Sequence, residues 1–257
     1  LFDETIDQRW ADCFRTDWEA NLSASQKMFN PVTKTEETVN WKPGDHCYTI
    51  PKRAVTAEYV ASVWPIWVFL PDSMRQKISD SQIQSVNNPD AEWPSNTHFQ
   101  DISMWPSFLK HEDAQRNDMN DQDGSRDVFA LRLADTYLLA AEACHLLGDN
   151  NKAAEYINVV RRRAAVPGKE AAMEIAPSVI NIDFILEERA RELCGEFHRF
   201  YDLKRTGKLY ERLNNPIMNS TTTGMFKEFQ VLRPIPRDQL SRLSNPQDFP
   251  QNPGYGD

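Results

Sequence analysis

The chain of 257 residues is acidic, because 29 lysines and arginines stand against 38 aspartates and glutamates and leave a net charge of −9. It therefore lacks the broad positive field with which proteins neutralise nucleic-acid phosphates, and we expect no nucleic acid as a partner. Hydrophobic residues make up 40% of the chain, which is enough for a real core, and no apolar run reaches the roughly 20 residues of a membrane span.

Residues 1–130 predict loops with short strands. Proline, asparagine, aspartate and most of the tryptophans are mixed there with short apolar runs, without a long helical period. The longest apolar run, 63–70, has the length of a strand. An aspartate-rich stretch at 118–124 resembles a calcium loop only superficially, because two ligand positions would fall on Met119 and Ala130. A polar surface loop is the better interpretation.

Residues 131–166 predict a helical hairpin. Gly148 ends the first helix, and Asp149 can cap the second, which stops at Pro167-Gly168. The apolar stripes consist of Leu131, Ala134, Leu138, Ala141 and His145 in the first helix and of Ala153, Ile157, Val160 and Ala164 in the second. Because many of these residues are small, the helices can approach closely, as they do in a tetratricopeptide unit.

A second helix pair is predicted at 182–193 and 197–209, again from apolar residues at helical spacing. One hairpin cannot bury its outer faces, so a stack of hairpins is the economical architecture. We therefore expect a mainly α fold of tetratricopeptide-like stacked helical hairpins, together with a loop-rich region that carries short strands.

The second pair is dense in charge. In EERARE, at 187–192, opposite charges lie at helical spacing and predict ion pairs such as Glu188 with Arg191. One interpretation makes Glu192 and Glu196 a glycosidase-like acid and base. These two residues lie one turn apart on the same helical path and cannot flank a bond, so we favour ion pairing with arginines.

The segment GEFHRFYDLKRTGKL, at 195–209, is interpreted as a packing helix. The side chains expected in the core are Phe197, Phe200, Tyr201 and Leu203, and those expected to be ion-paired or solvated are Arg199, Asp202, Lys204 and Arg205. The chain has no Gly-rich phosphate loop, no H-E-x-x-H, no G-x-S-x-G and no C-x-x-C. We expect no catalytic residues, no cofactor and no metal site.

Four motifs in order resemble the SusD/RagB family of bacterial outer-membrane nutrient-binding lipoproteins. They are LRLADTYLLAAEACHLLGDNNKAAEYINVVRRRA (131–164), ILEERARELCGEFHRFYDLKRTGKL (185–209), LRPIPRDQL (232–240) and QNPGY (251–255). A start near Asp7-Gln-Arg9-Trp, with Phe14 and Trp18, is similar to a strand region of the family. Phe197 departs from the pattern, because many members carry glycine there.

The resemblance implies a binder without catalysis. Such a protein captures glycans at the cell surface as a lid over a SusC-like TonB-dependent transporter, and a lipidated N-terminal segment that is absent from this chain holds it on the outer membrane. Members are about twice as long, so residues 1–257 resemble the C-terminal part of one SusD-like domain. Its predicted parts are the loop-rich region 1–130, paired tetratricopeptide-like helices at 131–212 and an irregular segment at 213–257.

Glycan capture requires aromatic faces against sugar C–H groups, with polar side chains on the hydroxyls. Trp41 and Trp93 stand among polar and turn-forming neighbours and are predicted to be exposed and to bind the ligand. Their predicted polar companions are Asn40, Asp45, Asn96 and His98. Three further tryptophans, Trp64, Trp67 and Trp105, are expected to be structural.

Three alternatives remain open. The same scaffold binds peptides in the RagB branch of the family, and the residues do not separate peptides from glycans. A tetratricopeptide adaptor that grips a protein tail is a second alternative, which the closing motifs 232–240 and 251–255 disfavour. A glycoside hydrolase is the third.

Overall fold

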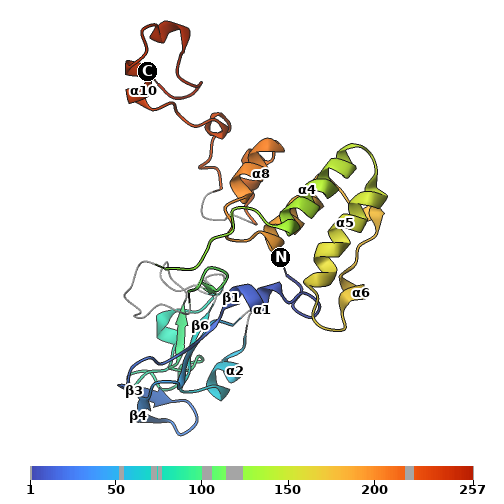
Figure 1. Cartoon of the computed structure of the whole chain (residues 1–257). Coiled ribbons are helices and arrows are strands. Elements are labelled where there is room, and N and C mark those ends of the chain that lie inside the picture. The colour runs from blue at the N-terminus through green and yellow to red at the C-terminus, as the bar shows by residue number, and fades with distance from the viewer. Residues whose placement is uncertain are drawn as a thin grey trace. The chain divides into compact units, whose positions relative to one another are not determined.

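The computed structural model describes residues 2–51, 55–70, 74, 77–99, 106–113, 124–217 and 223–256. The chain forms two compact units: a helical unit of Leu1–Arg9 and Val128–Asp257, and a sheet unit of Trp10–Asp127 (Figure 1). The boundary lies where the hydrophobic pattern becomes helical. Helices cover more residues than strands do. Among the described residues, no helix combines the length and the apolar character that crossing a membrane requires.

The sheet unit is built on a four-stranded sheet. In spatial order its strands are β2 (Asp17–Glu19), β5 (His46–Thr49), β6 (Trp67–Leu70) and β7 (Thr97–Phe99). β2 runs antiparallel to β5, whereas β5, β6 and β7 are mutually parallel. The apolar run 63–70 thus supplies β6, as its length predicted, and the short strands expected in this region are confirmed.

Shorter elements surround this sheet. They are the antiparallel hairpin of β3 (Ala24–Asn30) and β4 (Thr35–Trp41), the antiparallel pair of β1 (Phe14–Arg15) and β8 (Ser107–Phe108), the helices α1 (Arg9–Cys13) and α2 (Ala57–Ser62), and the 3-10 turn η1 (Asp80–Gln82). The region that resembled a strand region begins with α1 at Arg9, and its later residues Phe14 and Trp18 lie in strands β1 and β2. Two apolar clusters form the core, one around Val60, Val68 and Leu70 and the other around Trp41.

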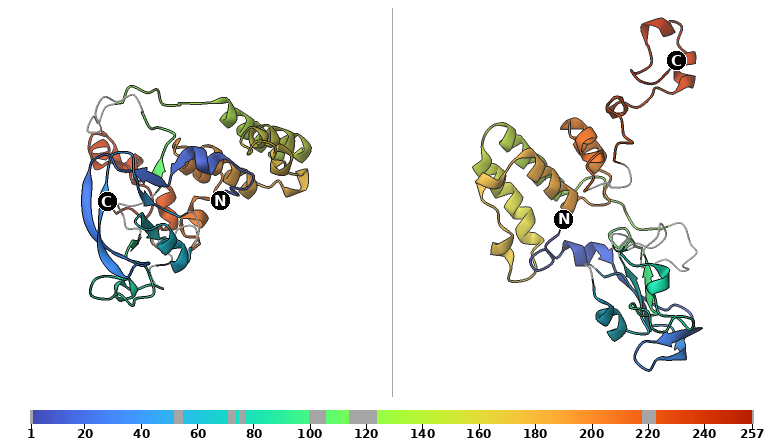
Figure 2. Two further views of the ribbon diagram at one scale, coloured as in Figure 1. Left: turned by 90° about the horizontal axis from the view of Figure 1, so that it is seen from below. Right: turned by 180° about the vertical axis from the view of Figure 1, so that it is seen from behind.

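The helical unit contains the hairpin of α4 (Leu133–Leu146) and α5 (Asn150–Arg163), which lie side by side in both views of Figure 2. Gly148 adopts a φ of 82° just past the end of α4, and the Asp149 carboxylate accepts a hydrogen bond from the backbone N–H of Lys152 at 2.9 Å. The predicted hairpin and both of its signals are confirmed.

The core between these helices consists of small and aliphatic side chains. It contains Ala134, Leu138 and Ala141 of α4, Ala153, Ala154, Ile157 and Val160 of α5, and Ile180 and Ile185 from the following segment. Ile185 belongs to α7 (Ile182–Glu192), so α7 packs against the hairpin. Leu131, expected on the stripe, precedes α4 and is exposed.

In the second helix pair, the helix predicted at 182–193 is confirmed as α7, whereas the helix predicted at 197–209 differs from its prediction. The chain breaks after α7, where Gly195 and Phe197 both adopt positive φ, and α8 begins only at Arg199 and ends at Arg205. The break changes which side chains face inward. Phe197 is 80% exposed and Tyr201 is 70% exposed, so their predicted core positions are wrong, whereas Leu203 is buried as predicted. Phe200 is half-buried and packs against the cluster that contains Leu203.

The rest of the helical unit is made of short elements. They are α6 (Glu170–Met173), η2 (Pro177–Val179), α9 (Leu209–Leu213), η3 (Glu228–Val231), α10 (Arg237–Ser241) and η4 (Pro246–Asp248). The two closing motifs contact each other. The side-chain amide of Gln251 accepts from the Ile235 N–H at 2.7 Å and donates to the Ile235 carbonyl at 2.9 Å, and the Tyr255 hydroxyl donates to the Leu232 carbonyl at 2.8 Å.

Candidate functional site

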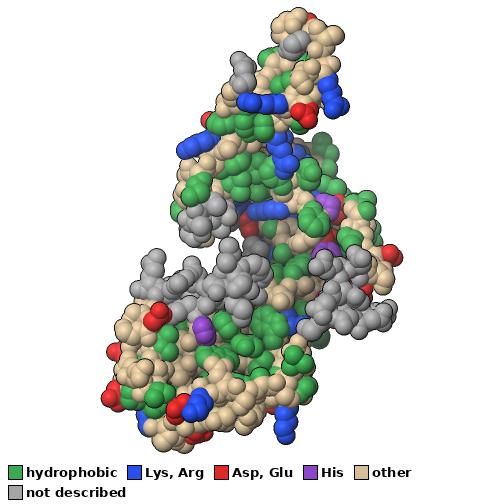
Figure 3. Space-filling model, turned by 90° about the vertical axis from the view of Figure 1, so that its left-hand side faces the viewer, with side chains coloured by type: hydrophobic (Ala, Val, Ile, Leu, Met, Phe, Trp, Pro, Cys, Tyr) green, Lys and Arg blue, Asp and Glu red, His purple; other side chains and the backbone are tan. Residues whose placement is uncertain are grey.

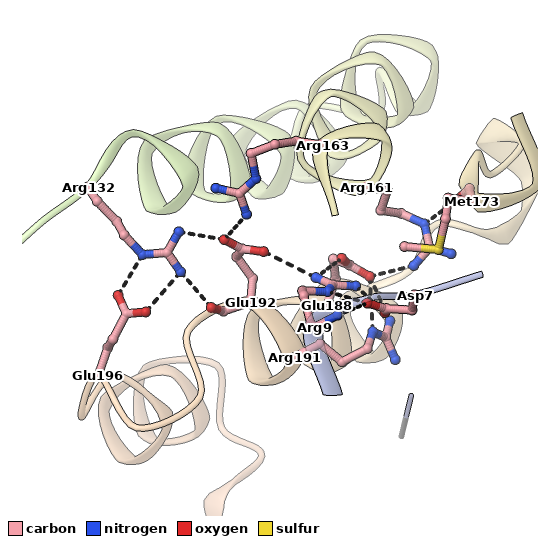
Figure 4. A network of polar contacts seen from close by, with 10 residues as sticks. All are labelled: Asp7, Arg9, Arg132, Arg161, Arg163, Met173, Glu188, Arg191, Glu192 and Glu196. Atoms are coloured by element: carbon pink, nitrogen blue, oxygen red, sulfur yellow. Dashed lines mark hydrogen bonds and ion pairs between the residues drawn. The ribbon is translucent and has the colours of Figure 1, made fainter. Parts of the chain in front are cut away.

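The charge-dense helix α7 buries its carboxylates among arginines (Figure 4). Arg9, whose chain position is far from α7, donates through Nη1 to Glu188 at 2.8 Å and to Glu192 at 3.2 Å. The Asp7 carboxylate pairs with the same guanidinium, with its Oδ2 at 2.6 Å from Nη2. Glu188, Glu192 and Arg9 are all buried, so this network lies in the interior of the helical unit.

Glu188 is the centre of the network. Its Oε2 also accepts from Arg161 at 2.6 Å and from Arg191 at 2.8 Å. Burial alone would raise the pKa of this carboxyl, but the charges of Arg9, Arg191 and Arg161 outweigh it and lower the pKa to about 2. Burial likewise opposes the charge of Arg9, whereas its bonds to Asp7 and Glu188 raise its pKa overall. Glu188 is therefore ionised at neutral pH, whereas a general acid must carry a proton.

Glu192 and Glu196 share one cation, Arg132. Arg132 donates to Glu196 through Nε at 2.8 Å and Nη2 at 2.9 Å, and to Glu192 through Nη1 at 2.5 Å. Arg163 pairs with Glu192 as well. The predicted pairing with arginines is confirmed, although the carboxylates are buried rather than solvated. A guanidinium occupies the space where a hydrolase would place the bond to be cut, which argues against an acid and base pair here.

A second charge cluster joins α7 to α8. Arg189 donates through Nε to the buried Asp202 at 2.7 Å, and Arg205 pairs with Asp202 at 2.9 Å and with Glu142 of α4. Hydrogen bonding to Glu142 is the largest influence on Arg205 and raises its pKa. The expected ion pairing of Asp202 and Arg205 is confirmed, and it fixes α8 against α4 and α7.

The sheet unit carries a row of four rings across its parallel strands. Tyr48 on β5 is paired in register with Trp67 on β6, and Phe69 on β6 is paired with His98 on β7. Ring centroids are 5.5 Å apart for Tyr48 and Phe69, 5.3 Å for Phe69 and His98, and 5.1 Å for Trp67 and His98. We call these four residues the aromatic row.

Part of the aromatic row is accessible. Tyr48 is 38% exposed and His98 is exposed, while Phe69 is buried between them. One face of the sheet unit in Figure 3 gathers hydrophobic side chains around a histidine, with most of its acidic and basic side chains toward the margin. A partly exposed aromatic surface of this kind suits a ligand with apolar faces.

A pocket of about 230 Å³ adjoins the row. Its aromatic walls are Trp41, Tyr48 and Trp67. Its other lining residues are Glu19, Ala20, Asn21, Leu22, Ala24, Ser25, Gln26 and Cys47. Aromatic walls combined with a few polar groups are the usual construction of a small-molecule site.

The predicted ligand-binding tryptophans occupy different positions from those expected. Trp41 is 7% exposed, so its predicted exposure is wrong, but it lines the pocket. It is buried because it alternates with exposed Asn40 on β4 and lies on the same side as buried Val39, a period-two signal that its polar neighbours obscured. Trp93 is half-buried and packs against the core cluster around Val60.

The polar companions divide into two groups. Asn96 is fully buried and donates to the carbonyls of Val60 at 3.0 Å and Ile66 at 2.7 Å, which is a structural role. Asn40 and Asp45 are exposed, and their side chains accept from Ser25 and from the Lys42 N–H. His98 belongs to the aromatic row. Contact of these residues with a ligand stays a prediction.

Trp67 was expected to be structural, and its additional place in the pocket wall was not predicted. Trp67 packs against the core cluster of Trp41, as does Trp64, but Trp67 also lines the pocket and contacts His98. Trp105 and the aspartate-rich stretch 118–123 lie outside the described residues. Across the described part of the chain, no group of three His, Cys, Asp or Glu side chains could hold a metal ion.

Comparison with known proteins gives a consistent match. The model of the SusD family matches residues 72–255, more than half of the chain. SusD-like protein P2 of Formosa agariphila is 32% identical over 141 residues, 53% of this chain and 27% of that protein. SusD-like proteins P38 and P25 of the same organism are 38% identical over 92 residues and 37% identical over 117 residues. These two matches cover 33% and 45% of this chain, and 18% and 22% of the relatives. The chain thus spans about a quarter of the length of the curated relatives that it matches.

Proposed function

The chain belongs to the SusD family, and we propose that it takes part in capturing glycans at the surface of a bacterial cell. The ligand in this proposal is an oligosaccharide or polysaccharide, which passes to a SusC-like TonB-dependent transporter. A lipid anchor would hold the protein at the outer membrane. The family membership supports a nutrient-binding surface protein in general, and the residues of the sheet unit support the choice of a glycan.

The observation that carries the proposal is the aromatic row beside a pocket. Sugar rings present C–H faces that pack on aromatic rings, and their hydroxyls need hydrogen-bonding partners at the edge. Tyr48 and Trp67 supply the rings, while Asn21, Ser25 and Gln26 lie in the pocket wall as polar side chains. One partly exposed surface therefore provides both kinds of contact.

We propose a supporting role for the helical unit, in which α4, α5 and α7 act as a tetratricopeptide-like stack without catalysis. The carboxylates that a hydrolase would need are engaged by arginines, as for Glu192 with Arg132 and Arg9. Prolonged incubation of the protein with polysaccharides should release no reducing sugar. Release that tracks the purified protein would contradict this part of the proposal.

Affinity gel electrophoresis tests the binding surface. Gels that contain a panel of polysaccharides should retard the full-length protein. Tyr48→Ala and Trp67→Ala should each weaken binding by about fivefold or more, since stacking of a nucleic-acid base on an aromatic side chain contributes about 1–3 kcal/mol. Tyr201→Ala is the matched control, because Tyr201 is an exposed tyrosine on α8 of the helical unit.

The control should migrate like the unmodified protein in the same gels. Retardation that Tyr201→Ala abolishes and Tyr48→Ala leaves unchanged would place the ligand elsewhere. Binding of peptides, together with no retardation by any polysaccharide, would instead support the peptide-binding alternative on the same scaffold.

A further inference from the structure

The charge on the pocket restricts its ligand. Among the described residues that line the pocket, only Glu19 carries a formal charge. Glu19 is exposed at the end of β2. The polar lining residues Asn21, Ser25 and Gln26 are neutral. A ligand in this pocket therefore meets a carboxylate without a cationic lining residue to offset it.

The surroundings of the pocket add to this charge. The turn at 42–45 packs against the pocket wall, because the Ala20 N–H donates to the Asp45 carbonyl at 2.8 Å and the Gly44 N–H donates to the Ala20 carbonyl at 2.9 Å. This turn carries the carboxylate of Asp45 and the ammonium of Lys42, both exposed. The charges of Asp45 and Lys42 offset one another, so this turn does not compensate the negative charge of Glu19.

The remaining charged neighbours lie on the sheet itself. Asp17, two residues before Glu19 on β2, is 3.3 Å from His46 Nε2, and its Oδ1 accepts from the Thr49 hydroxyl at 2.7 Å. Even if His46 is counted as a cation, the carboxylates of Asp17, Glu19 and Asp45 outnumber His46 and Lys42, and an anionic group placed in the pocket meets repulsion.

We propose that this pocket accepts one uncharged or amine-bearing sugar ring and rejects rings that carry carboxylate or sulfate groups. The inference rests on the proposed glycan capture and adds the electrostatic class of the ligand. The pocket volume of about 230 Å³ lies below the range of about 300–1,000 Å³ typical of sites that enclose a whole small molecule. It fits a single ring of a longer chain, while the aromatic row supports the adjacent part.

Matched polysaccharide pairs test the charge preference. The probes are dextran with dextran sulfate, and methyl-esterified polygalacturonan with its de-esterified form, in affinity gels at low ionic strength with the full-length protein. The neutral member of a pair should bind at least on the order of tenfold more tightly than the anionic member. Glu19→Gln should reduce this ratio, and Glu19→Lys should reduce it further or reverse it.

Glu36→Gln is the matched control. Glu36 is a partly exposed strand glutamate of the same unit, 3.8 Å from Lys27 and outside the pocket lining, so its replacement changes the net charge equally and should leave the ratio unchanged. Equal or tighter binding of the anionic members overturns the inference and leaves glycan capture standing. A ratio that Glu36→Gln changes as much as Glu19→Gln also overturns it. No retardation by any polysaccharide overturns both proposals.

Discussion

Replacing Glu188 by glutamine tests whether the buried network holds the helical unit together. The substitution keeps the shape of the side chain and removes its charge. Three arginines, Arg9, Arg161 and Arg191, donate to this carboxylate, which is fully buried. The variant removes from the interior an anion that all three guanidinium groups contact, while Arg9 keeps its contacts with Asp7 and Glu192.

The expected loss of stability can be worked from the pKa of Glu188. The three cations lower it from 4.5 to about 2, and this difference corresponds to about 3 kcal/mol of stability at neutral pH. Breaking a buried ion pair by removing one partner costs about 3–5 kcal/mol in other proteins. The two values agree, so we expect Glu188→Gln to lower the free energy of unfolding by about 3–5 kcal/mol.

The pH dependence provides a second signature. Because the folded-state pKa is lower than the unfolded-state pKa, the contribution of Glu188 is fully present above 4.5 and is lost as the pH falls from 4.5 toward about 2. Urea unfolding followed by far-UV circular dichroism measures this. The difference between the unmodified protein and Glu188→Gln should be largest at neutral pH and should shrink at about pH 3.

Glu174→Gln is the matched control for this experiment. Glu174 pairs with Arg162 at 2.7 Å, one residue along α5 from Arg161, but both side chains of this pair are 43% exposed. An exposed pair contributes about 0–1 kcal/mol, so the control should unfold almost like the unmodified protein. If Glu188→Gln costs no more than Glu174→Gln, or if its cost does not fall on acidification, the reasoning about the network is wrong.

Three further predictions concern stability and local order. In Gly254→Ala, the new Cβ would lie 2.3 Å from Cγ of Phe229 at a φ of 88°, so limited proteolysis should cut the segment 223–256 faster. Phe197→Gly should raise the free energy of unfolding by up to about 1 kcal/mol, because Phe197 is 80% exposed and has a φ of 64°. Tryptophan-monitored unfolding should show that Asn96→Ala costs about 2–4 kcal/mol, since two buried carbonyls lose their donor, whereas exposed Asn40→Ala should cost less than about 0.5 kcal/mol. A loss of stability in Phe197→Gly, or equal effects of the two asparagine variants, would contradict these assignments.

The helical hairpin could be predicted because its determinants are local. Gly148 and Asp149 are adjacent in the sequence and fix the turn, and the apolar stripes recur within each helix. The end of α7 was predicted to within one residue, but the orientation of the side chains in the following helix could not be predicted in the same way. Helical periodicity continues through 195–203 in the sequence, but the positive φ angles of Gly195 and Phe197 change which side chains of α8 face inward.

The aromatic row could not be predicted because it is non-local. Tyr48, Trp67 and His98 come from three strands, and only the parallel register of β5, β6 and β7 brings their rings together. Hydrophobicity separates aromatic residues from polar ones, but it does not say which ring lies at the edge of a pocket. Trp41 stands among polar residues in the sequence, and this isolation suggested, wrongly, that its side chain is exposed.

The charge network contains ion pairs between neighbouring residues of one helix, which the sequence predicts, and ion pairs between distant parts of the chain, which it does not predict. Helical spacing predicted the pair of Glu188 and Arg191, which are three residues apart. Arg9, in contrast, lies 179 positions away from Glu188 and donates to it at 2.8 Å. Arg9 comes from the N-terminal segment, Arg161 from α5 and Arg191 from α7 itself, so one carboxylate joins three separate parts of the chain. A shift of α7 by one turn against α5 would separate these buried charges, which is costly in an interior. The network therefore specifies how the helices pack, and this specificity explains the density of arginine and glutamate in α7 without a catalytic role.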